Sequence, residues 1–368
     1  MGRVRATTKK KPSAIFLVLF LASARYALSF ANQEIPGMTA HCIDVGQGDA
    51  TLLEFPCGAV LIDTGAQDNG HVIKLIDYLK VFFSRRSDLI KTLESVFITH
   101  DHPDHTKGLE EVVKEFRVKR LIYNGKGKAK DLGELCRVLR NKNKYGLEVE
   151  GVTFEKVVDH GNRSGLTDSM IDPIACDRCD PKITVLSGGF TRNPGWSVKE
   201  FANKNNHSLV IRVDFGKATF LFTGDLETDA IRKIAEFYRP ANQNSTSMLD
   251  TDVLRVGHHG SHNATTSDLL AAVTPEIALI SVGQWCFGKG KGSQFTTYAY
   301  GHPRKVAIDL LSLALREYRY LPVSTRVAIG PRKFVDCVIH KKIYTTAWDR
   351  TIQVRASSDG NYRVEINN

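Results

Sequence analysis

Four side chains able to bind a metal ion lie within six residues, in the segment His100-x-His102-x-Asp104-His105. The segment directly follows the apolar residues 96–98, which are typical of a strand that ends at the edge of a sheet. Imidazole nitrogens suit zinc and similar ions, and a carboxylate adds a harder ligand. The spacing therefore predicts a metal centre after this strand, and a charged surface loop is the alternative.

Three residues further along the chain extend this pattern. Asp225 follows the apolar run that ends at Phe222, where its two oxygens could bridge two cations, or where it could cap the next helix. His258 and His259 follow the predicted strand 252–256. We expect His258 to be the metal ligand because it lies nearer the strand end, and His259 to donate a proton or contact an anion.

Two more residues are candidates for the same site. His207 directly precedes a predicted strand and could bind one ion together with His100 and His102, although a solvated loop histidine fits equally well. Asp63 ends another predicted strand. Its carboxylate could accept the free N–H of a ligating histidine, or it could cap a turn.

The elements that must position these residues alternate between strands and helices, which favours an α/β layered domain. Strands are expected at 39–45, 50–54, 58–62, 94–99, 118–122, 208–214, 217–222, 252–256 and 277–282. Helices are expected at 70–84, 105–116, 129–142, 226–237, 266–273 and 303–318. Residues 158–206 predict mostly loop around the apolar run 183–186, and 343–366 predict a final hairpin turning at Asp359-Gly360.

The first 31 residues predict a signal peptide. Six basic and no acidic side chains accompany an apolar run, 14–24, that is too short to span a bilayer comfortably. Cleavage would reduce the net charge from +10 to +4. We expect a short linker at 32–37, one domain at 38–368, and a secreted or periplasmic protein with no stable membrane insertion. An uncleaved anchor is the alternative.

Seven cysteines follow this segment, and an odd number leaves at least one free thiol if all pairs are internal. Cys176-x-x-Cys179 could be half of a zinc site, but no second pair with matching spacing follows it. A disulfide, or two unpaired loop cysteines, is the favoured interpretation.

Further motifs accompany the His and Asp cluster in a fixed order. They are DVGQGDA at 44–50, LIDTG at 61–65, NHSLV at 206–210, TGD at 223–225, DVLRV at 252–256, HHGS at 258–261, SVG at 281–283 and YGHP at 300–303. In this combination the chain resembles a metallo-β-lactamase-fold hydrolase, most closely the extracytoplasmic hydrolase domain of the ComEC competence proteins. The insertions around 160–200 and 284–299 are not part of this pattern, and that branch often lacks a histidine at position 207.

The resemblance implies a fold and a mechanism. The fold would be an αββα four-layer sandwich, with two mixed sheets face to face, helices outside and the metal site at one edge. Two divalent ions, zinc or alternatively manganese, would share a water and lower its pKa, so that a bridging hydroxide is the nucleophile. The first ion would be held by His100, His102 and, as a further candidate, His207. The second would be held by Asp104, His105 and His258, with Asp225 between the two ions.

The substrate follows less directly. The resemblance favours cleavage of an anionic phosphodiester, DNA or a cell-envelope polymer, with Asp104 in the catalytic set. His302 and His259 could contact the phosphate, and a loop histidine without a function fits His302 equally well. The Gly- and Lys-rich segments 125–130 and 288–292 could add phosphate contacts. A flexible, solvated loop is the alternative and the favoured interpretation of 125–130, so 288–292 is the better candidate. The alternatives are another ester or amide hydrolase, of the β-lactamase or phosphorylcholine esterase type, and a non-catalytic binding protein that retains the fold.

Overall fold

The computed structural model describes residues 37–126, 133–242, 245–290 and 295–366, which lie in one compact unit beginning at Gly37. The predicted signal peptide and all of the predicted linker except Gly37 lie outside the described residues. Within the described ranges, every helix is too short or too polar to cross a bilayer.

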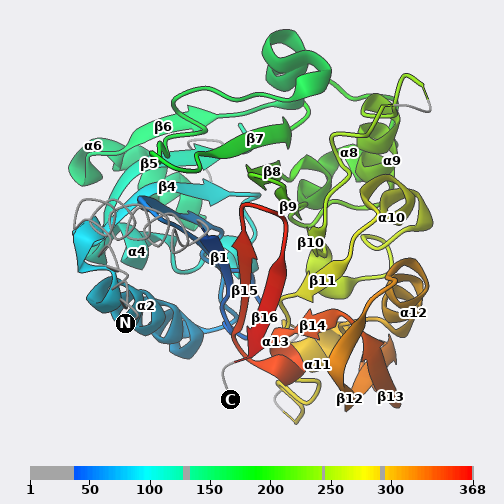
Figure 1. Cartoon of the computed structure of the whole chain (residues 1–368). Coiled ribbons are helices and arrows are strands. Elements are labelled where there is room, and N and C mark those ends of the chain that lie inside the picture. The colour runs from blue at the N-terminus through cyan, green and yellow to red at the C-terminus, as the bar shows by residue number, and fades with distance from the viewer. Residues whose placement is uncertain (1–36, 127–132, 243–244, 291–294, 367–368) are drawn as a thin grey trace, which may run out of the picture. The chain divides into compact units, whose positions relative to one another are not determined.

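Two large mixed sheets form the centre of this unit (Figure 1). The strand order of the first is β16-β15-β1-β2-β3-β4-β5-β6, and that of the second is β14-β11-β10-β9-β8-β7. The first contains β1 (Gly37–Cys42), β2 (Thr51–Phe55), β3 (Gly58–Ile62), β4 (Thr92–Ile98), β5 (Arg117–Tyr123), β6 (Glu148–Gly151), β15 (Ile352–Ser357) and β16 (Tyr362–Ile366). The second contains β7 (Pro181–Ser187), β8 (Val210–Phe215), β9 (Ala218–Phe222), β10 (Val253–Arg255), β11 (Ile277–Ile280) and β14 (Ile343–Thr345).

Side-chain alternation along the strands builds the layers. In β2, Leu53 joins the core between the sheets, whereas its neighbour Leu52 joins the core beneath the helices. Phe55 of one sheet meets Phe215 of the other, with ring centroids 6.4 Å apart. The first sheet is covered by α2 (Asn69–Arg85), α4 (Leu109–Glu115) and α5 (Glu134–Arg140), and the second by α9 (Thr228–Phe237), α10 (Ser267–Val273) and α12 (Lys305–Ala314). The expected four-layer αββα architecture is confirmed.

Some predicted elements differ from the structure. The helix expected at 105–116 is divided into α3 (Pro103–Thr106) and α4, because Gly108 leaves the helix and donates its N–H to the Thr64 carbonyl. The final hairpin is formed only by β15 and β16, since residues 343–345 join the second sheet and α13 (Thr346–Asp349) follows them. Short helices that were not predicted also occur. They are α6 (Lys142–Tyr145), α7 (Phe154–Lys156), α8 (Val198–Ala202) and α11 (Thr297–Tyr300).

The largest unpredicted element is a two-stranded hairpin of β12 (Tyr318–Gly330) and β13 (Lys333–Lys341). The helix expected to reach residue 318 ends at Ala314 instead. Pro322 obscured the strand pattern because proline cannot donate a ladder hydrogen bond. The pairing register accordingly shifts between Tyr318 and Val323.

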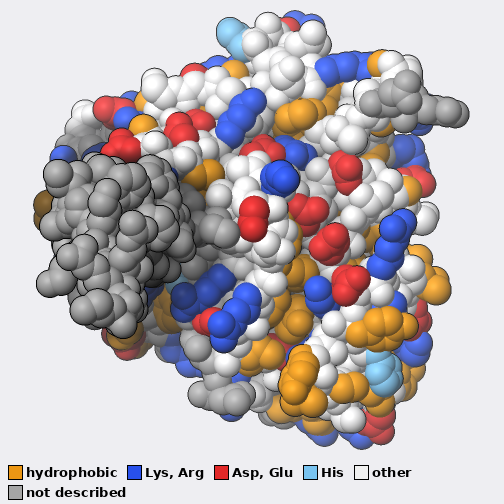
Figure 2. Space-filling view, viewed as in Figure 1, with side chains coloured by type: hydrophobic (Ala, Val, Ile, Leu, Met, Phe, Trp, Pro, Cys, Tyr) orange, Lys and Arg blue, Asp and Glu red, His pale blue; other side chains and the backbone are white. Residues whose placement is uncertain are grey.

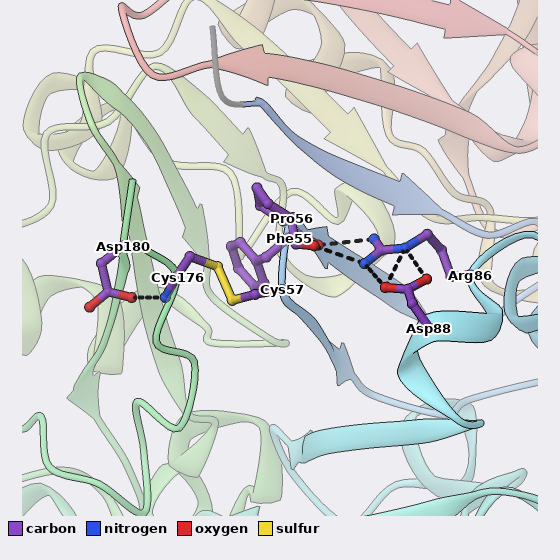
Figure 3. The surroundings of a disulfide bond; sticks show 7 residues. All are labelled: Phe55, Pro56, Cys57, Arg86, Asp88, Cys176 and Asp180. Carbon is purple, nitrogen blue, oxygen red and sulfur yellow. Dashed lines mark hydrogen bonds and ion pairs between the residues drawn. A yellow bond between two sulfur atoms is a disulfide. The ribbon is translucent and has the colours of Figure 1, made fainter. Parts of the chain in front are cut away.

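A disulfide joins Cys57, in the turn between β2 and β3, to Cys176, in the segment that leads to β7 (Figure 3). Arg86 stabilises the turn that contains Cys57 by donating to the carbonyls of Phe55 and Pro56. Asp180 stabilises the segment around Cys176 by accepting the backbone N–H of that residue at 2.8 Å. The bond therefore fastens the long segment before β7 to the first sheet, and Cys176 is not paired with Cys179.

We expect the double variant Cys57→Ser/Cys176→Ser to lose about 2–4 kcal/mol of unfolding free energy, because the bond closes a loop with a sequence separation of 119. Urea denaturation under oxidising conditions measures this loss. Cys286→Ser changes an exposed free thiol and serves as the control. Equal denaturation midpoints for the double variant and the parent would contradict the predicted contribution.

Candidate metal centre

Four strand ends, two from each sheet, bring the candidate residues together. Asp63 follows β3, the His100–His105 segment follows β4, Asp225 follows β9, and the two adjacent histidines follow β10. Asp104, His105, Asp225 and His259 each offer a ligand atom, and these four atoms all lie within 4.8 Å of one another. The cluster is suited to a divalent metal ion.

The contacts inside this group are close and largely shielded from solvent. His105 Nε2 lies 3.2 Å from Asp225 Oδ1, and His259 Nε2 lies 3.2 Å from Asp104 Oδ2. Both imidazoles and Asp225 are buried. His105 Nε2 has no well-aligned hydrogen-bond partner although it is buried. A buried ring nitrogen that faces carboxylates without such a bond fits a metal ligand.

His100 and His102 form the neighbouring half of the site, where His100 Nε2 lies 3.0 Å from His102 Nδ1. Asp225 lies between the two halves. Its Oδ1 faces His105, whereas its Oδ2 lies 3.9 Å from His100 Nε2 and 3.8 Å from His259 Nε2. Burial, together with the neighbouring imidazole of His105, holds the pKa of His100 well below its ordinary value, so its ring is neutral.

The structure reverses the positions predicted for His258 and His259, because His259 and not His258 points into the cluster. His259 is buried, and its Nδ1 lies 2.8 Å from the Ser281 carbonyl, which aims its Nε2 at the cluster. His258 lies at the margin, 3.9 Å from Asp225 Oδ2 and 3.5 Å from Glu227 Oε1. Both histidines have positive φ, 49° and 55°, so the chain bends sharply after β10. Closeness to the strand end was therefore the wrong criterion, and His259 replaces His258 in the ligand set that we propose.

His207 lies outside the cluster, which corrects its expected ligand role. Its Nε2 is 2.7 Å from the Phe201 carbonyl, and its Nδ1 accepts the Phe190 N–H at 3.0 Å. The rings of Phe190, Trp196 and Phe201 surround it. Both ring nitrogens are thus engaged by the backbone, and neither is left for a metal. The next residue, Ser208, contacts the site instead, because its Oγ accepts the Asp225 N–H at 3.0 Å.

Asp63 makes the contact predicted for it. Its Oδ2 lies 2.7 Å from His105 Nδ1, and Thr99 donates to the same carboxylate through its N–H and its hydroxyl, both at 2.8 Å. Asp63 has a φ of 58°, and this left-handed backbone turns the carboxylate toward the site. Because Nδ1 of His105 is hydrogen-bonded to Asp63, a proton on Nδ1 points away from the cluster, and Nε2 faces Asp225.

A cavity of about 600 Å³ opens over the cluster. His302 is buried at its wall, where its ring stacks on Tyr300 at 5.8 Å and on His259 at 6.3 Å. Burial and the nearby His258 and His259 hold the pKa of His302 well below its ordinary value. The cavity is lined by Gln47, Ala66, Gln67, His102, Pro103, Asp104, Lys107, Asn205, Asp225, His258, His259, Phe295, Tyr300 and His302.

The two Gly- and Lys-rich segments do not contribute to this wall within the described ranges. Residues 125–126 and 288–290 are absent from the lining. Residues 127–130 and 291–292 lie outside the described residues.

Asp49 and Arg255 form a buried ion pair that the sequence analysis did not assign. Arg255 Nη2 donates to Asp49 Oδ2 at 2.6 Å, and the Asp49 N–H donates to the Asp104 carbonyl at 2.8 Å. The pair therefore supports the backbone of a candidate ligand. An arginine inside the apolar strand predicted at 252–256 was the signal available in the sequence, because a buried charge needs a partner.

Arg255→Met is expected to destabilise the protein by about 3–5 kcal/mol, since it leaves the Asp49 carboxylate buried without its cation. Chemical denaturation measures the change. Arg232→Met removes an exposed pair with Asp229 and should cost less than about 1 kcal/mol. If the two variants were equally stable, the structural role of the buried pair would be refuted.

The family model described as the metallo-beta-lactamase superfamily matches residues 43–284. The chain belongs to this superfamily. ComE operon protein 3 of Bacillus subtilis (strain 168) is 26% identical over 280 residues, covering 73% of this chain and 30% of that protein. Recombination protein 2 of Haemophilus influenzae (strain ATCC 51907 / DSM 11121 / KW20 / Rd) is 26% identical over 259 residues, covering 70% of this chain and 26% of that protein.

These relatives confirm the resemblance to ComEC-like members of the superfamily, and the chain spans less than a third of their length. Among solved structures, the metallo-beta-lactamase fold protein YhfI from Bacillus subtilis matches with 14% identity and a TM-score of 0.33, covering 60% of this chain and 70% of that one.

The pKa values of the cluster predict how metal binding depends on pH. Burial alone would lower the pKa of both His105 and His259. The carboxylates of Asp225 and Asp63 instead raise the pKa of His105 well above its ordinary value, and those of Asp225 and Asp104 raise the pKa of His259. Without metal, the His105 ring is therefore protonated at neutral pH and the His259 ring keeps its proton to a higher pH than a free imidazole, so a metal ion must displace protons from the site. We expect zinc binding to release at least one proton near pH 7 and to weaken as the pH falls. Titration calorimetry in buffers of different ionisation enthalpy counts these protons, and a count of zero would contradict the assignment.

Proposed function

We propose that the protein is a hydrolase that uses two divalent metal ions to cleave phosphodiesters. The observation that supports this most strongly is the position of Asp225, with one oxygen near His105 and the other near His100 and His259. One ion would be held by His100 and His102, and the other by Asp104, His105 and His259. Asp225 would contact both. Zinc fits this nitrogen-rich set, and manganese is the alternative.

When bound, the two ions would supply an activated water and neutralise negative charge on the reacting group. The protein's own residues hold this arrangement in place. Asp63 fixes the ring of His105, and the Ser281 carbonyl fixes that of His259. These outer contacts keep both Nε2 atoms directed at the cluster, so little reorganisation is needed when substrate binds.

Polar groups in the cavity wall suit an anionic substrate. Lys107 supplies a positive charge, and the buried neutral ring of His302 can donate a hydrogen bond to a phosphoryl oxygen. Burial, together with Asp104 and Asp225, raises the pKa of Tyr300 to about 12, so its hydroxyl remains protonated and available as a donor. These donors surround the space next to the metal cluster, which supports a phosphodiester as substrate.

The names of the relatives agree with a phosphodiester substrate, since recombination acts on DNA and one relative is named Recombination protein 2. A cell-envelope phosphodiester polymer is the other candidate. We place the reaction outside the cytoplasm, in the periplasm or the secreted fraction. The predicted signal peptide supports this location.

The proposed activity is tested with purified protein that is stripped of metal and reloaded with zinc or manganese. The substrates are bis(p-nitrophenyl) phosphate, single-stranded DNA and a chromogenic β-lactam. We expect turnover of the two phosphodiesters that requires metal and is lost on chelation. Turnover of the β-lactam alone would replace the phosphodiesterase proposal with a lactamase. Absence of both metal binding and turnover would favour a binding protein.

A further inference from the structure

The surface charge of this protein is nearly balanced, so it offers an anionic substrate little guidance. Residues 32–368 carry a net charge of only +4. Figure 2 shows basic and acidic side chains interspersed over one face, with hydrophobic side chains at the lower right, where Figure 1 places the β12–β13 hairpin. Inside the cavity, the acidic Asp104 and Asp225 accompany the basic Lys107. Recognition of an anion therefore depends on individual hydrogen-bond donors in the cavity wall.

Gln47 is a cavity residue whose side-chain amide is only half paired. It lies between β1 and β2, lines the cavity over the metal cluster and is 1% exposed. Its Oε1 accepts the Thr297 hydroxyl at 3.0 Å. Its Nε2 is buried and has no hydrogen-bond partner among the described residues. Because a buried N–H without an acceptor is costly, this donor points to an acceptor that a ligand supplies.

Thr297 determines which end of the Gln47 amide faces the cavity. Thr297 is fully buried at the start of α11, the short helix that carries Tyr300 of the cavity wall. Since its hydroxyl donates to Oε1, the N–H groups of Nε2 are left for the cavity side. Gly283 allows this close packing, because a Cβ there would lie 2.6 Å from Thr297 Oγ1 and 3.3 Å from the Gln47 backbone nitrogen. Thr297 is therefore a positioning residue for the amide.

The backbone next to Gln47 is fixed against a candidate metal ligand. The Asp49 N–H donates to the Asp104 carbonyl at 2.8 Å. Gly48 lies so close to the same segment that a Cβ would be 3.1 Å from the Asp104 carbonyl oxygen. Gln47 is thereby held at a set position relative to the metal cluster, as a residue that orients a substrate must be.

We propose that Gln47 Nε2 binds a non-bridging oxygen of the substrate's phosphoryl group, with Thr297 holding the amide in place. The inference rests on the proposed phosphodiesterase function and deepens it by naming a residue that selects the substrate class. A phosphodiester has two non-bridging oxygens that share a negative charge, so one can approach the cluster while the other accepts the amide N–H. A carbonyl carbon carries a single such oxygen. The contact therefore favours phosphodiesters over carboxylic esters and amides.

Binding of inorganic phosphate to the zinc-loaded full chain, measured by titration calorimetry, tests the contact without requiring turnover. We expect Gln47→Met to weaken phosphate binding about 10- to 100-fold, the range for one hydrogen bond to a charged acceptor. Gln47→Glu keeps the shape of the side chain and its contact with Thr297, but it replaces the donor with an acceptor and should also weaken binding. The matched control is Gln353→Met, which removes an amide on β15 that lies beside Tyr78 and outside the cavity lining.

The positioning role of Thr297 has its own pair of variants. Thr297→Val is expected to weaken phosphate binding about 3- to 10-fold, because the amide can then turn its oxygen toward the anion. Thr297→Ser keeps the hydroxyl and should retain the parent affinity. Zinc content and thermal denaturation show whether each variant is folded and loaded. Equal phosphate affinities for the Val and Ser variants would refute the positioning role.

Turnover of bis(p-nitrophenyl) phosphate separates this inference from the proposed function. Both Gln47 variants should lose kcat/KM while they keep the parent's zinc content. Parent affinity for phosphate in both Gln47 variants, or no phosphate binding by the zinc-loaded parent, would overturn the assignment. Phosphate binding by a parent protein that cleaves no phosphodiester would support the anion contact and refute the phosphodiesterase instead.

Discussion

Asp225→Ala is expected to reduce kcat/KM for a phosphodiester by at least about 1,000-fold and to reduce bound metal below two ions per chain. The reason is geometric, because the Asp225 carboxylate lies within 4 Å of both His100, in one half of the cluster, and His105, in the other. Its loss removes a contact to each proposed ion and leaves the imidazoles of His105 and His259 without their shared anion. Metal content by mass spectrometry and steady-state kinetics measure the two effects.

The matched control is Asp229→Ala, which removes an exposed carboxylate four residues away in α9 that pairs with Arg232. It should keep its metal and its activity. Asp225→Asn preserves the shape of the side chain and removes its charge. If either Asp225 variant retained two ions and full turnover, the proposed bridging role would be wrong.

Gly65→Ala is expected to reduce activity at least about 100-fold although glycine contributes no side chain to the site. A Cβ at this position would lie 1.5 Å from the Asp104 carbonyl oxygen and 2.7 Å from the His105 nitrogen. The backbone that carries two candidate ligands would have to move, and such overpacking also costs about 1–3 kcal/mol of stability. The close approach explains the glycine, since only a hydrogen fits there.

Gly133→Ala is the control, because nothing lies within 4 Å of the Cβ that it would gain. Thermal denaturation, metal content and turnover would be compared for both variants. A Gly65→Ala protein with unchanged metal affinity and turnover would show that the ligand segment is not held against residue 65 as the structure has it.

The strand-end residues show how much of the site could be predicted from the sequence. The end of one strand carries all four of the first candidates, because they lie within six residues of one another. They are His100, His102, Asp104 and His105. Asp225 was predictable for the same reason, since an apolar strand ends just before it. Local pattern was sufficient for these residues because each follows the end of an apolar strand.

The predictions were wrong where the direction in which a histidine ring points depends on contacts that the sequence does not show. His258 and His259 occupy two successive left-handed positions, so counting from the strand end could not tell which ring faces inward. His207 precedes a strand as a ligand would, but an aromatic pocket and two backbone bonds hold it elsewhere. These partners are far apart in the sequence and meet only through tertiary packing.

The layered fold was more predictable than its irregular parts. Alternating and apolar runs gave most strands of both sheets. The β12–β13 hairpin was missed because Pro322 breaks its pattern and its side chains are mostly exposed, so no core face marks it. The Asp49–Arg255 pair was missed because its two residues are 206 positions apart.

Anomalous diffraction from crystals of the zinc-loaded protein tests the central claim most directly. We predict two zinc peaks on either side of Asp225, one in contact with His100 and His102 and the other with Asp104, His105 and His259. A single peak, or zinc bound away from Asp225, would contradict the dinuclear centre on which the proposed hydrolysis depends.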